Sequence, residues 1–445
     1  LFRLPFYLRL LCHSQEIPSG RAALLTRMVR QAVVRELEQD DSPFHDDGLL
    51  DADGRDKLNR VLVWRDEFEL PGGELFEALE RLAVHLQGRR RGEDVNAQVR
   101  LAREEALAVL GENGRILLKV ARELNLLELA EGETVRFGHQ LIQEYFAAQR
   151  FAREPEPARL AVEWRAAAVR PGLAETRREL ADSDPLPLLP NTGWEETALL
   201  AAAMAREADG YVAGLMAVNL PVAGRAAAQP DVGVSAGLRA RLGRALVERS
   251  RDGQADLRAR IAAGLALGEL GDPRFERRTG PEGHEFLLPP LVAVAGGRYW
   301  IGSEEGHYED EAPVHEVEIA GFRIGQFLVT NAEWACFMAA GGYEDERWWE
   351  TEEARVWRRE GGSEGQKVWH REARKTLKND PDLIERLLKE GRIHSQAAAN
   401  YRWHRDADDD EFEAKLAEVY PEGRLTQPAN WTDDTYNNPA QPVVG

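Results

Sequence analysis

The sequence predicts a multidomain protein that is helical through its first two thirds and mixed α+β toward its end. Three observations predict this architecture. The 445 residues suggest two to four domains of ordinary size. Apolar residues recur at helical spacing up to about residue 286 and alternate at strand spacing from about residue 292. The composition, 43% hydrophobic and 30% charged, is typical of a soluble globular protein.

Charge and cysteine content narrow the range of partners and compartments. The formal net charge of −20 removes the electrostatic attraction that drives most nucleic-acid binding. No apolar run approaches the ~20 residues that a membrane-spanning helix needs. Cys12 and Cys336 lie in regions predicted to be different domains, which argues against a disulfide scaffold. We therefore expect a cytoplasmic protein with no nucleic-acid and no membrane partner.

The two ends of the chain read like the interior of domains. The opening "LFRLPFYLRLLCH" lacks the charged and then apolar pattern of a signal peptide. The closing "NNPAQPVVG" has neither a final helix nor a polar tail. We expect the chain to be part of a longer protein, truncated at both ends.

The first 154 residues are predicted to form a helical part (residues 1–60) and a second small domain (residues 61–154). "RAALLTRMVRQAVVREL" carries one apolar stripe at helical period. Three further amphipathic helices follow in "ELFEALERLAVHLQ", "AQVRLAREEALAVL" and "GRILLKVARELNLL", and "LLELAEGETVRFGH" reads as two short strands. Three helices and a β-hairpin form a winged-helix pattern. The hairpin holds one arginine among several glutamates, so we expect it to pack against its neighbours rather than read DNA.

Residues 155–286 are predicted to form a helical spacer. This segment is rich in alanine, leucine and arginine, and its last helix ends at Gly271-Asp272-Pro273, a glycine and proline stop signal. The ending "ALGELGDPR" resembles helical repeats of the HEAT type, while a plain alanine-rich spacer stays equally open.

The final segment, residues 287–445, begins with apolar residues at strand spacing rather than helical spacing. Alternating runs predict strands at Val292 to Ile301, Val314 to Ile319 and Phe322 to Val329. Thr330 or Asn331 is then expected to cap a helix from Ala332 to Ala340. A charged, tryptophan-rich stretch follows, whose aromatic residues suit either a ligand surface or the packing of a domain poor in regular structure.

One motif lies at the junction of the predicted hairpin and the next helix. In "RFGHQLIQEYFAAQRFA" the pattern consists of Phe137, His139, Gln143, Glu144, Tyr145, Ala147 and Ala148. It resembles the close of the NACHT-type module of STAND ATPases, a family of signalling switches. The resemblance implies that His139 contacts the β-phosphate of bound nucleotide, a role that suits an imidazole able to donate a hydrogen bond. The alternative is a core histidine satisfied by the backbone.

The stretch "LPFYLRLL" fits the same resemblance, which places Pro5 against the adenine. Leu4 departs from the asparagine that the family usually has there. No GxxxxGK[ST] phosphate loop occurs in the chain, so we expect no ATP hydrolysis by these residues. The resemblance implies an ATPase core upstream of Leu1, which binds ATP or ADP with Mg²⁺ in the longer protein, and an oligomer on activation.

A second resemblance covers roughly residues 287–445, with an insertion between Trp348 and Pro428. Its anchors are Gly297, Gly302, Pro313, His315, Phe322, Val329, Thr330, Asn331, Phe337, Gly342, Tyr343, Asn430, Trp431 and Pro442 to Gly445. They are similar to the formylglycine-generating enzyme, or sulfatase-modifying factor, family, whose fold is C-type-lectin-like. Ala312 departs from the family's usual arginine. The resemblance implies that the copper-binding cysteine pair and the calcium sites lie beyond residue 445, so the domain is expected to be incomplete.

A cysteine and an acidic loop are two further candidates for a functional site. Cys336, placed inside a helix between Trp334 and Phe337, is expected to be a buried structural thiol. The loop "EEGHYEDEAPVHE" contains His307, His315 and several acids, but its spacing follows no metal-ligand rule, so a solvated loop is expected. We predict no catalytic residue, metal ligand or cofactor in this segment.

The sequence thus favours a piece of a bacterial STAND-class signalling ATPase whose formylglycine-generating-enzyme-like domain senses an unknown protein or small molecule. In this interpretation His139 and Pro5 are the nucleotide-sensing residues. The alternative is a copper-dependent formylglycine-generating oxidase whose catalytic cysteines lie beyond residue 445.

Overall fold

The computed structural model describes residues 18–39, 42, 44, 49–52, 67–89, 99–130, 133–180, 185–304, 311–361, 363–389, 393, 395–420 and 423–444. Pro5 and Cys12 lie outside these ranges. The chain divides into two compact units, Leu1–Arg170 with Pro187–Gly271, and Pro171–Leu186 with Asp272–Gly445. Each unit is described by itself. Within the described ranges, no helix combines the length and the apolar character needed to cross a bilayer.

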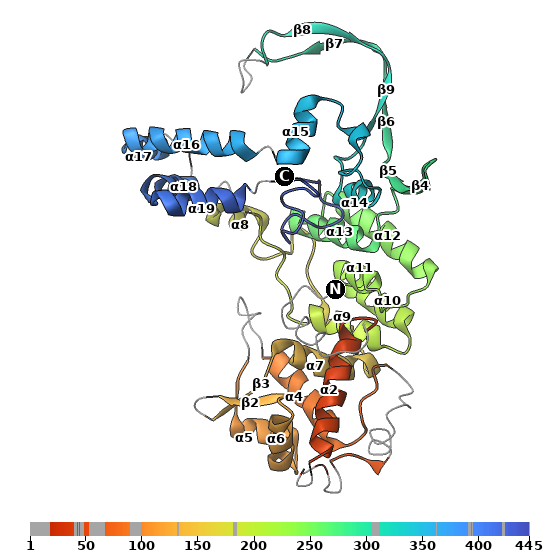
Figure 1. The fold of residues 1–445 in the computed structure, drawn as a ribbon. Helices are drawn as coiled ribbons and strands as arrows, with labels where there is room; N and C mark the ends of the chain where they lie inside the picture. Colours follow the sequence, from red (N-terminus) through yellow and green to blue (C-terminus); the bar gives the residue numbers. More distant parts are fainter. Residues whose placement is uncertain are drawn as a thin grey trace. The chain divides into compact units, whose positions relative to one another are not determined.

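The first unit begins with helices and a small sheet (Figure 1). Its elements are α2 (Arg21–Leu37), α4 (Glu74–Gln87), β1 (Leu101–Ala102), α5 (Arg103–Leu110), α6 (Gly114–Glu123), β2 (Leu127–Ala130), β3 (Thr134–Phe137) and α7 (Gln140–Arg153). The strands form an antiparallel sheet in the order β1-β3-β2. The predicted helices and hairpin are therefore present. The helix predicted in "AQVRLAREEALAVL" starts only at Arg103, because Leu101 and Ala102 pair with β3 instead.

A helical array completes the first unit. It comprises the 3-10 turn η3 (Pro157–Leu160), α9 (Glu195–Met204), α10 (Ala208–Val218), α11 (Leu220–Ala228), α12 (Ala236–Arg251) and α13 (Leu257–Leu270). Side chains of Asn219, Ser235 and Asp256 accept hydrogen bonds from backbone N–H groups at the starts of α11, α12 and α13.

One hydrophobic core runs from Ala22 to Leu270. Helix α7 packs on α9, where the rings of Phe151 and Trp194 lie 5.2 Å apart. Buried Gln87 joins the two helices, since it accepts from Gln143 Nε2 at 2.8 Å and donates to the carbonyl of Gly193. The core is thus continuous across residue 154, where the sequence suggested a domain boundary.

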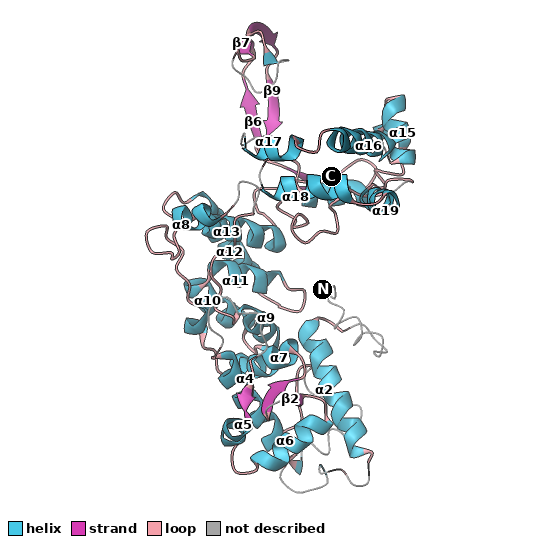
Figure 2. Cartoon of the chain, turned by 90° about the vertical axis from the view of Figure 1, so that its left-hand side faces the viewer, coloured by secondary structure: helices cyan, strands magenta, loops and turns pink. Residues whose placement is uncertain are grey.

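The described part of the second unit contains three short antiparallel ribbons, whose strands are labelled in Figure 1 and partly visible in magenta in Figure 2. Strands β4 (Glu276–Thr279) and β5 (Glu285–Leu288), β6 (Leu291–Val294) and β9 (Phe322–Gly325), and β7 (Gly297–Ile301) and β8 (His315–Ile319) pair with each other. In the last ribbon Tyr299 pairs with Val317, and the neighbouring position pairs Trp300 with Glu316. This alternation gives the ribbon one mainly apolar face.

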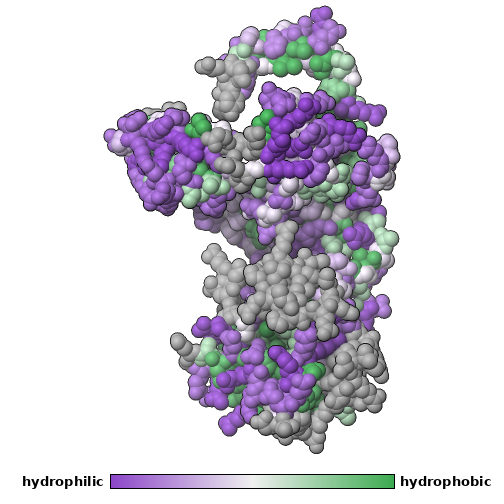
Figure 3. All heavy atoms as spheres, viewed as in Figure 1, coloured by the Kyte–Doolittle hydropathy of each residue, from purple (hydrophilic) through white to green (hydrophobic). Residues whose placement is uncertain are grey.

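Helices follow the ribbons in the second unit. They are α14 (Asn331–Ala339), α15 (Glu352–Glu360), α16 (Ser363–Asn379), α17 (Leu383–Lys389), α18 (Ser395–Asp406) and α19 (Asp409–Val419), with η5 (Glu346–Trp348) between the first two and α8 (Leu173–Glu179) earlier in the chain. Helix α14 confirms the predicted helix with a shift of one residue. Thr330 caps it, and Glu333 completes a capping box. Figure 3 shows that α16–α19 present a mostly hydrophilic surface in this view.

The tryptophan-rich segment is an insertion in the fold, because the residues before it and the residues after it contact each other. Asn331 Nδ2 donates to the carbonyls of Tyr436 and Asn438 at 2.6 and 3.0 Å. Thr330 forms an isolated β-bridge with Pro442. These contacts hold the end of the described chain against the start of α14, with α15–α19 between them in the sequence.

Candidate functional site

His139 stands at the start of α7 and serves as its N-cap. Its backbone is extended, with φ −148° and ψ 145°, and its Nδ1 accepts a hydrogen bond from the N–H of Leu141 at 3.1 Å. Partial burial lowers the pKa of the imidazole below its ordinary value of 6.5. Because Nδ1 accepts, the neutral ring carries its proton on Nε2. A phosphate could receive a hydrogen bond from that atom alone.

The residues after His139 in the motif belong to the core. Tyr145 is fully buried, and its hydroxyl lies 2.8 Å from both Thr26 Oγ1 and Gln149 Nε2. Burial raises the pKa of the Tyr145 phenol. Gln143 is equally buried and bonds to Gln87. These polar side chains therefore have packing roles, and the predicted contact of His139 and Pro5 with nucleotide stays a prediction.

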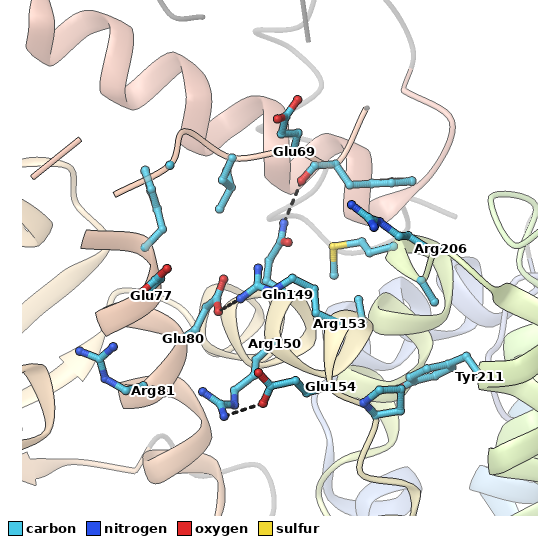
Figure 4. Close-up of a pocket in the computed structure, with 18 of the residues that line it drawn as sticks. Glu69, Glu77, Glu80, Arg81, Gln149, Arg150, Arg153, Glu154, Arg206 and Tyr211 are labelled. Carbon is cyan, nitrogen blue, oxygen red and sulfur yellow. Dashed lines mark hydrogen bonds and ion pairs between the residues drawn. The ribbon is translucent and has the colours of Figure 1, made fainter. Parts of the chain in front are cut away.

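A cleft in the first unit is a feature that sequence reasoning missed (Figure 4). Its volume is about 1020 Å³, at the upper end of the ~300–1,000 Å³ typical of ligand pockets. Helix α4 forms one wall and the last turns of α7 form another. The loop at residues 68–73 and the α9–α10 junction complete it.

A buried carboxylate lies in the cleft wall. Glu80 on α4 is 3% exposed and accepts a hydrogen bond from the guanidinium of Arg153 on α7. Burial raises the pKa of the Glu80 carboxyl above its ordinary value, and Arg153 opposes that shift. The signal was present in "ELFEALERLAVHLQ", where Glu80 occupies a position on the apolar stripe beside Phe76 and Leu79. An acid on such a stripe predicts a buried charge that needs a partner.

Cys336 in the second unit departs from its prediction. It is only partly buried, so the expectation of a fully buried thiol is wrong. The reason is that Asn331 is the one buried residue of α14, whose other faces are at least partly accessible in the described chain. The rings of Trp334 and Phe337 do flank the thiol in sequence and lie 4.8 Å apart.

The acidic loop lies partly outside the described residues, since Glu305 to Asp310 are not among them. Of its described ends, Glu304 accepts from the N–H of Val314 at 3.1 Å, and His315 Nδ1 lies 2.9 Å from the carbonyl oxygen of Pro313. Within the part of the chain that the structure describes, no group of three or more His, Cys, Asp or Glu side chains could hold a metal ion.

Some of the tryptophans pack against other rings, as expected for a packing role, and others are exposed, as expected for a ligand surface. Trp349 contacts Tyr343 and stacks on Trp357, with ring centroids 5.6 and 5.7 Å apart, so these rings fill space between α14 and α15. Trp348 and Trp369 are 61% and 58% exposed and pack little.

Comparison with known proteins identifies part of the second unit. Residues 278–381, under a quarter of the chain, match the "Sulfatase-modifying factor enzyme 1-like domain" family. A hercynine oxygenase of Mycolicibacterium smegmatis is 36% identical over 102 residues, which are 22% of this chain and 23% of that protein. A formylglycine-generating enzyme of Mycobacterium tuberculosis is 40% identical over 57 residues, 13% of this chain and 19% of the relative. No solved structure matches.

These matches bear on the domain assignment and on the two functions that the sequence left open. The chain spans about a fifth of the length of these curated relatives. The formylglycine-generating-enzyme-like domain is confirmed. Its match starts at residue 278 rather than 287, because it includes most of the short β4–β5 hairpin. The relatives' names favour the oxidase alternative over the sensor interpretation. The resemblance of residues 1–154 to STAND ATPases stays a prediction.

Proposed function

We propose that this chain is part of an oxidoreductase whose formylglycine-generating-enzyme-like domain oxidises a substrate with molecular oxygen. The observation that carries the proposal is the match of residues 278–381 to the sulfatase-modifying-factor family. The names of two relatives add support, since one is an oxygenase and the other generates formylglycine. Of the two chemistries, we propose formation of formylglycine from a cysteine of a partner protein.

The described residues do not supply a metal site for this chemistry. Copper in such an oxidase requires soft, paired thiolate ligands, and Cys336 is the single described cysteine. It is partly covered and lies on α14, away from any described cluster of metal-ligating side chains. No step of the proposed reaction is therefore assigned to these residues. We propose that the catalytic cysteines of the longer protein lie beyond residue 445.

The described part of the domain would then act as a scaffold. The contacts of Asn331 with Tyr436 and Asn438 fix the chain that leads out of the described domain. Arg358 on α15 is 4% exposed and donates to the carbonyl of Tyr343 at 2.7 Å, so the insertion is fastened to the turn after α14. Such buried, doubly anchored segments hold a site on rigid elements.

The experiment supplies the full-length protein with oxygen, Cu(I) and a sulfatase-type cysteine peptide, and measures the aldehyde product by mass spectrometry. A parallel reaction supplies hercynine with Fe(II) instead. Aldehyde from the peptide supports the proposal, and turnover of hercynine alone would replace it by the other chemistry. Oxygen consumption in neither reaction would contradict an oxidoreductase of this kind. Aldehyde from the present chain that is lost in Cys336→Ser would instead make Cys336 catalytic.

A second candidate function, a nucleotide-controlled switch, is favoured by a separate observation. The first unit has the order helix, strand, helix, helix, strand, strand from α4 to β3, which is the order of a winged-helix domain. His139 follows the last strand directly and caps the next helix. We propose that this part belongs to a STAND-type ATPase whose core precedes Leu1, and that it controls the oxidising domain. In the full-length protein, His139→Asn should then release ADP faster although it keeps the cap, and unchanged ADP retention would contradict the switch.

A further inference from the structure

We propose that the cleft between α4 and α7 is a binding site for a guanidinium group, and that Arg153 occupies it as an internal stand-in. The inference is independent of both functions proposed above. It rests on the burial of one carboxylate, the exposure of its partner and the composition of the surrounding walls.

The first argument is the unequal burial of the Glu80–Arg153 pair. The side chain of Glu80 is 4% exposed, whereas that of Arg153 is 58% exposed. The carboxylate thus belongs to the floor of the cleft, and the guanidinium reaches it from the solvent side. A buried carboxylate needs a charged or hydrogen-bonding partner, but nothing in the packing requires that partner to be Arg153. An external guanidinium can donate to the same carboxylate once Arg153 turns outward into water.

The second argument is that two other arginines of the lining, Arg81 and Arg150, have their own acceptors. Arg150 donates to Glu154 at 2.7 Å, one turn along α7, as Figure 4 shows. Arg81 donates to the carbonyl of Leu110 at 3.2 Å. Arg153 is the arginine whose hydrogen bond to Glu80 an incoming guanidinium would replace. The lining holds five glutamates and four arginines, so its formal charge is slightly negative.

The third argument is the shape and chemistry of the remaining walls. Phe76, Met204 and Tyr211 are buried to at least nine tenths and line the cleft, so the lining contains apolar groups as well as the carboxylate. A guanidinium on a methylene stem fits this combination, because the stem packs on apolar groups while the charged end reaches the acid. A guanidinium also stacks on aromatic rings better than an ammonium does. The structure thus assigns the site to an arginine side chain or a small guanidine compound.

Isothermal titration calorimetry on the full chain tests the proposal with two probes, acetyl-arginine amide and the peptide acetyl-Leu-Arg-Leu-amide. Matched probes carry citrulline, which has the shape of arginine without its charge. Both arginine probes should bind, and the citrulline probes should bind at least about tenfold more weakly, as expected for loss of a charge-assisted hydrogen bond. If the peptide binds more tightly than acetyl-arginine amide, the natural source of the guanidinium is an arginine side chain of a peptide. If the two probes bind equally, the source is a small guanidine compound.

Variants separate this site from an ordinary ion pair. Glu80→Gln should weaken binding at least about tenfold, whereas Arg153→Ala should tighten it severalfold because the internal competitor is gone. Arg136→Ala is the matched control, since it removes an arginine paired to Glu128 elsewhere in the same unit. Circular dichroism checks that each variant folds. Equal binding of citrulline and arginine probes, unchanged binding in Glu80→Gln, or no binding by either the wild type or Arg153→Ala at millimolar concentration would overturn the proposal.

Discussion

At His139 one side chain fixes both the start of a helix and its own tautomer. Its Nδ1 accepts from the backbone of Leu141, so the proton of the neutral ring is on Nε2. Asparagine and aspartate are the usual residues for such a cap, and histidine is not among the favoured ones. An imidazole at this place therefore provides a cap on a titratable ring, and in the neutral ring Nε2 carries the proton.

The cap makes a prediction about stability. His139→Ala should lower the free energy of unfolding by about 1 kcal/mol, because the N–H of Leu141 loses its acceptor. His139→Asn should recover most of this loss. Urea unfolding followed by circular dichroism measures both values. If asparagine is as destabilising as alanine, the cap is not what His139 contributes.

The pKa of His139 adds a dependence on pH. Burial lowers the pKa of the folded state below 6.5, so between the two values the unfolded state binds more protons. The contribution of His139 to stability is thus complete above pH 6.5 and is lost as the pH falls through the folded-state pKa. The stability of the wild type relative to His139→Asn should fall from pH 7 to pH 5. A difference that is constant over this range would contradict the lowered pKa.

At Glu80, burial shifts the pKa in the opposite direction to the shift at His139. Its pKa is raised by burial in a setting that includes Arg153, Glu77 and Arg150. Arginine binding needs the ionised carboxylate, so affinity should fall as the pH is lowered and should do so above the ordinary pKa of 4.5. Calorimetric titrations from pH 7.5 to 4.5 measure this, with Glu80→Gln as the variant whose residual binding should not follow the same curve.

At the scale of elements, α14 and the segment at residues 428–443 form one structural unit although the insertion separates them. The amide of Asn331 is 4% exposed and satisfies two carbonyls of the returning chain. The N–H of Val443 donates to the carbonyl of Val329 at 3.0 Å. The insertion can therefore vary in length without disturbing the strands and helix that it interrupts, since its two ends are fixed next to each other.

Removing the Asn331 amide tests whether it holds the segment at residues 428–443 against α14. Asn331→Ala should destabilise the returning segment by about 1–3 kcal/mol, because two partly buried carbonyls lose their donor. Hydrogen exchange should then become faster at Gln441 and Val443, whose N–H groups bond within this region. Asn437→Ala is the control, since its amide bonds only to nearby Asp434 on the exposed surface. Equal exchange in both variants would show that the segment is held by something else.

At the scale of the whole molecule, the two units differ in how much core supports them. The first has a hydrophobic core that extends from Ala22 to Leu270. In the second, the described hydrophobic cluster is centred on Leu377, Ile384 and Ala398 within the insertion. Hydrophobic burial is the dominant favourable term in folding, so the second unit has much the smaller share of it.

Unequal cores predict two thermal transitions. Differential scanning calorimetry of the chain should show a first transition of the second unit and a later one of the first unit. Leu82→Ala, at a fully buried position, should lower only the later transition, with a cost of about 2–5 kcal/mol. Ile384→Ala should lower only the earlier one. A single transition that both variants shift alike would mean that the units unfold together.

The sequence by itself determined many of the helices, the hairpin before His139 and the C-terminal strand region, because their signals are local. Helices α15, α16 and α18 of the tryptophan-rich stretch were not predicted. Periodicity within α4, α6 and α7 and the cap of α14 at Thr330 act over a few residues. The family anchors of the second unit were readable for the same reason. The strands at Glu276–Thr279 and Glu285–Leu288, with sequences ERRT and EFLL, lack the alternation that would have predicted them.

Only the tertiary structure decided which distant residues meet. Glu80 and Arg153 are separated by 73 residues, and Asn331 and Tyr436 by 105. Nothing in either local sequence specifies its partner, since such contacts arise from the packing of whole elements around a shared core. The cleft, the exposure of Arg153 and the closure of the insertion were decided at that level. The sequence could indicate a buried charge at Glu80, but only the packing of α4 against α7 shows that its partner faces water.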